Sequence, residues 1–103
     1  MKSSEAKVVL EEGQVKIIGG PALRLDRPCL LRLYMQDLIT TDRLCLDLVN
    51  YAGMRLTLHE EMVGFWQLLE VLDGPCGAPG LLQEARSLLR EPFTSREILI
   101  EMS

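Results

Sequence analysis

The segment RLCLDLV, residues 43–49, constrains the fold more than any other part of the chain. It alternates strictly, with Leu44, Leu46 and Leu48 on one face and Arg43, Cys45 and Asp47 on the other. Such alternation is typical of a β-strand that turns one face towards a hydrophobic core. The chain is therefore expected to fold around a sheet in which this segment is a central strand.

A hairpin is predicted near the N-terminus. Residues 7–11 and 14–18 are short β-branched runs that meet at Glu12-Gly13, where a turn is expected. The glycines and proline of residues 19–21 then break the second run. These features predict two antiparallel strands at the start of the fold.

Residues 28–39 are compatible with two structures. Alternation would suit a strand, whereas a period of 3.6 residues suits a helix whose apolar arc contains Leu30, Leu31, Tyr34, Met35, Leu38 and Ile39. Pro28 suits the first turn of such a helix, and Asp26 suits its N-cap. A helix is predicted here.

A second helix is predicted from a capping box. Thr57-Leu58-His59-Glu60 has the S/T-x-x-E spacing, so this helix is expected to begin at Leu58. Its apolar arc contains Met62, Phe65, Trp66, Leu68, Leu69 and Leu72. The glycines and prolines of residues 74–80 predict a loop, and a third amphipathic helix is expected over residues 81–90.

Two extended runs complete the pattern. Residues 54–56 resume an extended pattern after the turn at residues 50–53. Residues 96–102 alternate between apolar and charged side chains, which favours a strand. The Thr94-x-x-Glu97 spacing also suits a helix start, so both structures stay open for this tail.

The predicted order is β-β-α-β-(β)-α-α-β. It corresponds to an α/β fold, with α+β as the alternative, built on a small open mixed sheet that carries two to three amphipathic helices mainly on one face. At 103 residues the chain is expected to form a single domain, residues 1–103. Residues 1–5 are expected to be disordered.

Charge and cysteine content exclude several classes of function. The net charge is −4 and the eleven basic residues form no cluster, which argues against nucleic-acid binding. No apolar run is long enough to span a membrane, and the opening residues lack the apolar stretch of a signal peptide, so none is expected. Three widely spaced cysteines favour free thiols, so a soluble, cytoplasmic protein without membrane contact is expected.

No convergent catalytic set emerges from the sequence. His59 is the only histidine, and it has no nucleophile signature beside it. The cysteines lack the spacing of a metal site, so neither a metal nor another cofactor is expected. The loop at residues 74–80 has a glycine content that could suit phosphate, but its two prolines donate no hydrogen bond there and a helix precedes it. Cys76 within it is the thiol expected to be most exposed and reactive.

Residues 7–72 resemble in layout the STAS domain, the fold of bacterial anti-sigma-factor antagonists. The resembling features are a strand pair that ends at Gly19-Gly20, a helix, the strand Leu44–Leu48 with its L-D-L pattern, and a second helix. In that family a D-S-[ST]-G segment at the second helix carries a phosphorylated serine or threonine. Here Thr57 lies nearest that position, without the aspartate, serine or glycine. The resemblance implies a binding module, with Thr57 as its candidate modification site.

The sequence thus favours a non-enzymatic regulatory or adaptor protein that binds another protein, with a homodimer left open as one form of that binding. The expected partner-binding residues are Met62, Phe65, Trp66 and Leu69, because aromatic residues and methionine are enriched at interfaces. The alternative is a small thiol- or histidine-dependent enzyme or ligand carrier that uses Cys76 or His59.

Overall fold

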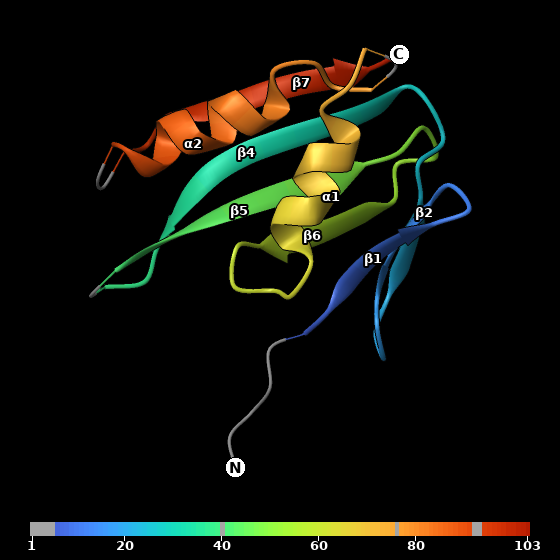
Figure 1. The fold of residues 1–103 in the computed structure, drawn as a ribbon, viewed down its shortest axis with the longest axis horizontal. Coiled ribbons are helices and arrows are strands. Elements are labelled where there is room, and N and C mark those ends of the chain that lie inside the picture. The colour runs from blue at the N-terminus through green and yellow to red at the C-terminus, as the bar shows by residue number, and fades with distance from the viewer. Residues whose placement is uncertain (1–5, 40, 76, 92–93) are drawn as a thin grey trace.

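The computed structural model describes residues 6–39, 41–75, 77–91 and 94–103. Two sheets and two helices make up the fold (Figure 1). The smaller sheet has the order β1-β2-β3 and contains β1 (Val8–Glu11), β2 (Gln14–Ile17) and β3 (Ala22–Arg24). The larger sheet has the order β6-β5-β4-β7 and contains β4 (Cys29–Asp37), β5 (Asp42–Val49), β6 (Arg55–His59) and β7 (Glu97–Met102). The helices are α1 (Phe65–Leu72) and α2 (Leu81–Leu89).

The predicted N-terminal hairpin is confirmed. Strands β1 and β2 pair antiparallel, with Val8 opposite Ile17 and Glu11 opposite Gln14. The turn between them needs two residues with positive φ, Glu12 at 50° and Gly13 at 75°. The sequence analysis did not identify β3, which pairs with β2 after the break at residues 19–21.

The helix predicted over residues 28–39 is wrong, because this segment contains the nine-residue strand β4. Leu31 and Leu33 are completely buried, whereas Leu30 before them and Gln36 after them are exposed and Arg32 between them is half-buried, which is the alternation of a strand. β4 lies between β5 and β7, so both of its edges are hydrogen-bonded. Pairing on two sides outweighs the helical spacing of the apolar residues, since each strand neighbour contributes a row of cross-strand contacts.

The helix predicted to begin at Leu58 begins instead at Phe65. Thr57 and Leu58 belong to β6, and the residues of the expected capping box have other partners. The Thr57 hydroxyl donates to Asp47, and a Glu60 carboxylate oxygen accepts the backbone N–H of Leu44. Helix α1 follows Gly64, whose φ of 91° and close approach to the Val8 carbonyl favour glycine.

The C-terminal elements follow the prediction closely. Helix α2 covers most of residues 81–90, and residues 97–102 form the strand β7 rather than a helix. The two helices carry buried residues on one side, and these belong to the same core cluster as the leucines of β4 and β5. In Figure 1 both helices lie in front of the larger sheet.

The architecture is α+β, and both sheets are antiparallel, so the expected mixed sheet is wrong. A single parallel bridge, Lys7 to Val63, joins the start of β1 to the segment before α1. The core lies between the helices and the larger sheet, with Val8, Val15 and Leu23 of the smaller sheet closing one side. Over the described residues, neither helix has the length and apolar character needed to cross a membrane.

Candidate functional site

The face of the larger sheet that points away from the core is the candidate site, and we call it the open face. Strand alternation places its residues in rows across the four strands, as the pairing register gives them. The open face consists of Glu97, Leu99 and Glu101 from β7, Leu30, Arg32, Tyr34 and Gln36 from β4, Arg43, Cys45, Asp47 and Val49 from β5, and Arg55, Thr57 and His59 from β6. Among the described elements, both helices contact the other face.

A buried carboxylate lies at the centre of the open face. Asp47 is only 4% exposed, although neither α1 nor α2 covers this side of the sheet. Its Oδ1 atom accepts the Thr57 hydroxyl at 2.8 Å and the Tyr34 hydroxyl at 3.2 Å. Its Oδ2 atom accepts Arg32 Nη1 at 3.1 Å. Three donors therefore compensate the charge of Asp47, as a buried carboxylate requires.

Arg32 connects this carboxylate to the edge of the sheet. Its guanidinium also contacts Glu97 Oε2 at 2.9 Å and lies 4.3 Å from the centre of the Tyr34 ring. The hydrogen bond to Glu97 and the one to Asp47 raise the pKa of Arg32. Burial, and then the charge of Asp47, raise the pKa of Tyr34 to about 12. Both groups thus remain protonated donors over the physiological range.

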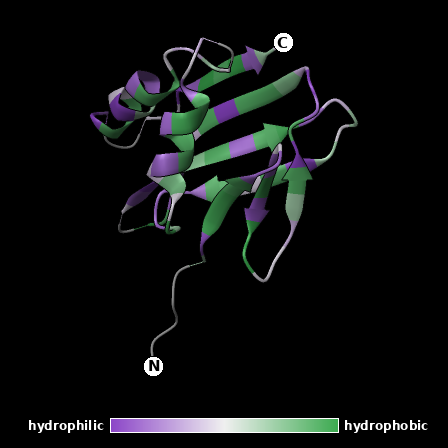
Figure 2. Cartoon of the chain, turned by 45° about the vertical axis from the view of Figure 1, so that its right-hand side comes forward, coloured by the Kyte–Doolittle hydropathy of each residue, from purple (hydrophilic) through white to green (hydrophobic). Residues whose placement is uncertain are grey.

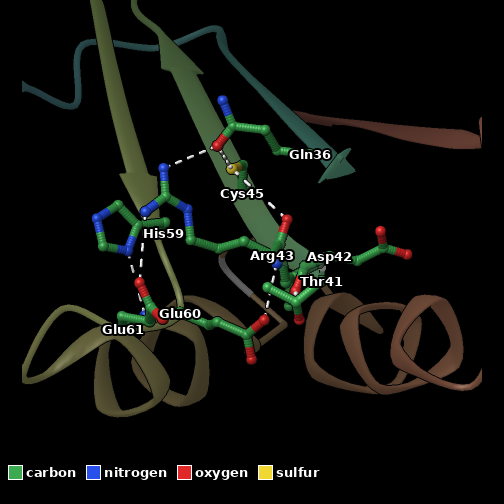
Figure 3. A network of polar contacts seen from close by, with 9 residues as sticks. Gln36, Thr41, Asp42, Arg43, Cys45, His59, Glu60 and Glu61 are labelled. Atoms are coloured by element: carbon green, nitrogen blue, oxygen red, sulfur yellow. Dashed lines mark hydrogen bonds and ion pairs between the residues drawn. The ribbon is translucent and has the colours of Figure 1, made fainter. Parts of the chain in front are cut away.

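A second polar cluster lies where β5 begins (Figure 3). Arg43 donates to Gln36 Oε1 at 2.8 Å and contacts Glu61 at 3.4 Å. The Cys45 sulfur is 3.6 Å from the same oxygen of Gln36. His59 Nδ1 accepts the backbone N–H of Glu61 at 3.2 Å. These contacts fix the side chains at this end of the open face.

The register brings Cys45 and His59 opposite each other, a juxtaposition that the sequence analysis missed. The sequence analysis placed Cys45 on a strand and His59 on a helix, so only the pairing of β5 with β6 shows that the two residues are neighbours. Burial is the main cause that raises the pKa of the Cys45 thiol, and the same holds for Cys29. A protonated thiol is a poor nucleophile, and burial favours that form of Cys45.

Exposed aliphatic side chains flank the central carboxylate cluster. Leu99 is 57% exposed and lies opposite Arg32, and Leu30 is 39% exposed and precedes Arg32 by two residues on the same face. Val49, half-buried, lies opposite Leu30. The open face therefore combines an apolar strip with an arginine and a tyrosine whose polar groups are already paired.

The predicted partner-binding residues, Met62 just before α1 and three residues on it, separate into two groups. Phe65 and Leu69 are completely buried and belong to the core. Met62 and Trp66 are half-buried, and the Trp66 ring packs edge-to-face on Phe65 with 5.4 Å between ring centroids. Trp66 also lines a cleft of about 460 Å³ between α1 and α2, with Leu82, Arg86 and Leu89.

The remaining candidates from the sequence are Thr57, Cys76 and the loop at residues 74–80. Thr57 is exposed, but it belongs to a strand of the open face and not to a helix start. Cys76 lies outside the described residues. In the loop before α2, the Asp73 carboxylate accepts the N–H groups of Gly80 and Leu82, so a side chain of this chain occupies the place considered for phosphate. Within the described ranges, no group of three or more metal-ligating side chains lies close enough to hold an ion.

The sequence analysis did not select Asp47, Arg32 and Tyr34. A signal existed for Asp47, which is an acidic residue on the outward side of the clearest strand in the chain. Arg32 and Tyr34 could not be found in the same way, because the predicted helix placed them on opposite sides. The segment forms a strand, and the two residues share a face.

No family model, curated protein or solved structure matches the chain. The resemblance to the STAS domain stays a prediction, and the function has to be argued from the open face itself.

Proposed function

We propose that this protein is a non-enzymatic regulatory or adaptor protein that binds a protein partner through the open face. The observation that supports this most is the stacked pair of Arg32 and Tyr34 between the exposed side chains of Leu30 and Leu99. Arginine and tyrosine are enriched among the residues that contribute most to binding energy. Neighbouring apolar side chains supply the surface that a partner would remove from water.

The internal pairing of the polar groups also supports a binding role. Arg32 is held by Asp47 and Glu97 before any partner arrives, so binding would cost little side-chain entropy at this position. The hydrogen bonds of the Asp47 carboxylate are already satisfied, which lowers the desolvation cost of covering it. An enzyme would instead need a group left poised for proton transfer or attack.

Photo-crosslinking with a matched control tests this proposal. A photoreactive amino acid at position 99 samples the open face, and the same group at position 89 samples α2, where the leucine is similarly exposed. We expect a discrete protein adduct from position 99, lost when Leu30→Asp is added and kept when Glu70→Arg on α1 is added. Equal adducts from both positions, or a position-99 adduct insensitive to Leu30→Asp, would contradict the proposal.

The enzymatic alternative, a thiol- or histidine-dependent enzyme or carrier that uses Cys76 or His59, has its own discriminating measurement. Alkylation of Cys76 followed against pH, with Cys76→Ser as the blank, reports the pKa of that thiol. A thiol pKa well below about 8.5 would favour the enzyme over the binding module.

A further inference from the structure

We infer that the partner of the open face is a second copy of this chain, packed face to face around a two-fold axis that runs parallel to the strands. This inference rests on the proposed function and names the partner of the same surface. It comes from the way in which charge is distributed across the four strands.

The charged side chains of the open face form two edge columns of opposite sign. On β7, Glu97 and Glu101 project from one edge strand of the sheet. On β6, the opposite edge strand, Arg55 and His59 project from the same face, and Arg55 carries the positive charge there. Arg32 forms ion pairs with both Asp47 and Glu97, so the edge charges left without an ion pair among the described residues are Glu101 on β7 and Arg55 on β6, which have opposite signs.

A two-fold axis parallel to the strands reverses each row of residues. The row Glu101, Leu30, Val49, Arg55 of one copy then faces Arg55, Val49, Leu30, Glu101 of the second copy. The rotation therefore places each Glu101 over Arg55 of the second copy and each Leu30 over Val49. In the next rows it places Arg32 over Asp47, and Glu97 over His59.

The other in-plane axis, perpendicular to the strands, gives the opposite result. It would place β7 over β7, so that Glu97 of one copy meets Glu101 of the other. Like charges placed together across an interface cost several kcal/mol, about tenfold in affinity for each 1.4 kcal/mol. The charge pattern thus selects one of the two arrangements. Aligned packing of sheets, with strand directions within about 30°, preserves that correspondence between the columns.

The same arrangement covers the exposed aliphatic side chains. Leu30 and Val49 meet twice, once on each side of the axis, which is the self-complementarity that a two-fold interface requires. Leu99 of one copy lies over Thr57 of the other. The helices remain on the outer sides of such a dimer, and both cores are undisturbed.

Charge reversal at the edge columns tests the inference. Within the described part of the chain, neither Glu101 nor Arg55 takes part in an ion pair, so their reversal should leave the fold intact. We expect the wild type to dimerise in sedimentation equilibrium. Glu101→Arg and Arg55→Glu should each weaken the dimer by about tenfold or more, because each places like charges opposite one another. Glu70→Arg, the same charge change on α1, should leave the dimer unchanged.

Mixing the two single variants gives the decisive measurement. In a heterodimer of Glu101→Arg with Arg55→Glu, both contacts are again between opposite charges. The mixture should recover an affinity within about threefold of the wild type, less than 1 kcal/mol. Circular dichroism of each variant checks that the fold is retained.

Three outcomes would overturn the inference. They are a wild type that stays monomeric, a dimer insensitive to both reversals, and a weakened dimer that mixing does not restore. The proposed function has a separate readout, because an open-face adduct with a different protein at position 99 would keep it while the homodimer failed. Loss of that adduct as well would overturn both.

Discussion

At the centre of strand β5 both faces are closed to water, by different means. On the inner face, Leu44, Leu46 and Leu48 are completely buried among aliphatic side chains from the helices and the smaller sheet. On the outer face, Cys45 and Asp47 are only 2% and 4% exposed, yet their cover is a single layer of polar side chains from the same sheet. Figure 2 shows the contrast between hydrophobic and hydrophilic residues across the fold.

The difference has an energetic consequence. Burial of a leucine side chain contributes roughly 1.5–3 kcal/mol and does not depend on the orientation of its neighbours. A hydrogen bond on the outer face contributes on the order of 1 kcal/mol, and only while its partner keeps the right geometry. The inner face therefore supplies most of the stability of the fold, and the outer face is the surface through which we propose that a partner binds.

An aspartate placed on each face in turn tests most directly how much each face contributes to stability. Leu46→Asp would bury a charge without a partner among the core leucines, at a cost of roughly 4 kcal/mol or more. Leu99→Asp places the same charge on the open face, where the leucine is 57% exposed, and should change stability by less than about 1 kcal/mol. Thermal melts followed by circular dichroism compare the two. An unchanged melting temperature for Leu46→Asp would mean that the inner face is misassigned.

A smaller effect is expected within the outer face itself. Asp47→Ala removes the acceptor shared by Arg32, Tyr34 and Thr57, which should cost about 2–3 kcal/mol. The cost stays below that of a fully buried ion pair, because the Arg32 side chain is 39% exposed and keeps its contact with Glu97. Urea denaturation measures the change in the free energy of unfolding.

Glu97→Gln is the matched control for that measurement. It breaks only an exposed ion pair with Arg32 and should cost less than about 1 kcal/mol. If this substitution destabilises the protein more than Asp47→Ala does, the centre of the polar cluster lies at the sheet edge and not at Asp47.

The same contrast explains which elements could be predicted from the sequence. Residues 43–49 of strand β5 could be predicted because their inner-face positions are all leucine and their outer-face positions are not. In β4 the outward positions Leu30 and Tyr34 are themselves apolar, so a period of two is obscured and the helical spacing dominates. The correct structure depends on pairing with β5 and β7, which are distant in sequence, and local patterns carry no information about that pairing.

The prediction of the residue at which α1 begins fails for a related reason. Thr57 and Glu60 have the spacing of a capping box, but both side chains bind partners on β5 instead. Tertiary contacts thus override a local motif. The open face shares this dependence on pairing, since its residues come from four strands and only the register places them in rows.

The smallest predicted effect is a titration that concerns the outer face alone. Burial is the main cause that raises the pKa of Tyr34 from 10.0 to about 12, and the charge of Asp47 follows. A raised phenol pKa means that folding favours the protonated form, so its stabilising contribution is complete below pH 10 and is lost as the pH rises towards 12. Phenolate absorbance of the wild type minus that of Tyr34→Phe isolates this group from Tyr51, and a midpoint near 10 would contradict the burial of the hydroxyl.

Asp47→Asn separates the two causes of that shift. It removes the negative charge beside the phenol and keeps a side chain of similar size, so the Tyr34 midpoint should move down from about 12 while burial holds it above 10.0. An unchanged midpoint would show that the Asp47 carboxylate does not affect the pKa of Tyr34. The Tyr34 hydroxyl would then not count among the three donors to Asp47. A midpoint that falls all the way to 10.0 would mean that the charge, and not burial, keeps the hydroxyl protonated. Because the leucines of the inner face carry no titratable group, any change in this midpoint reports on the open face.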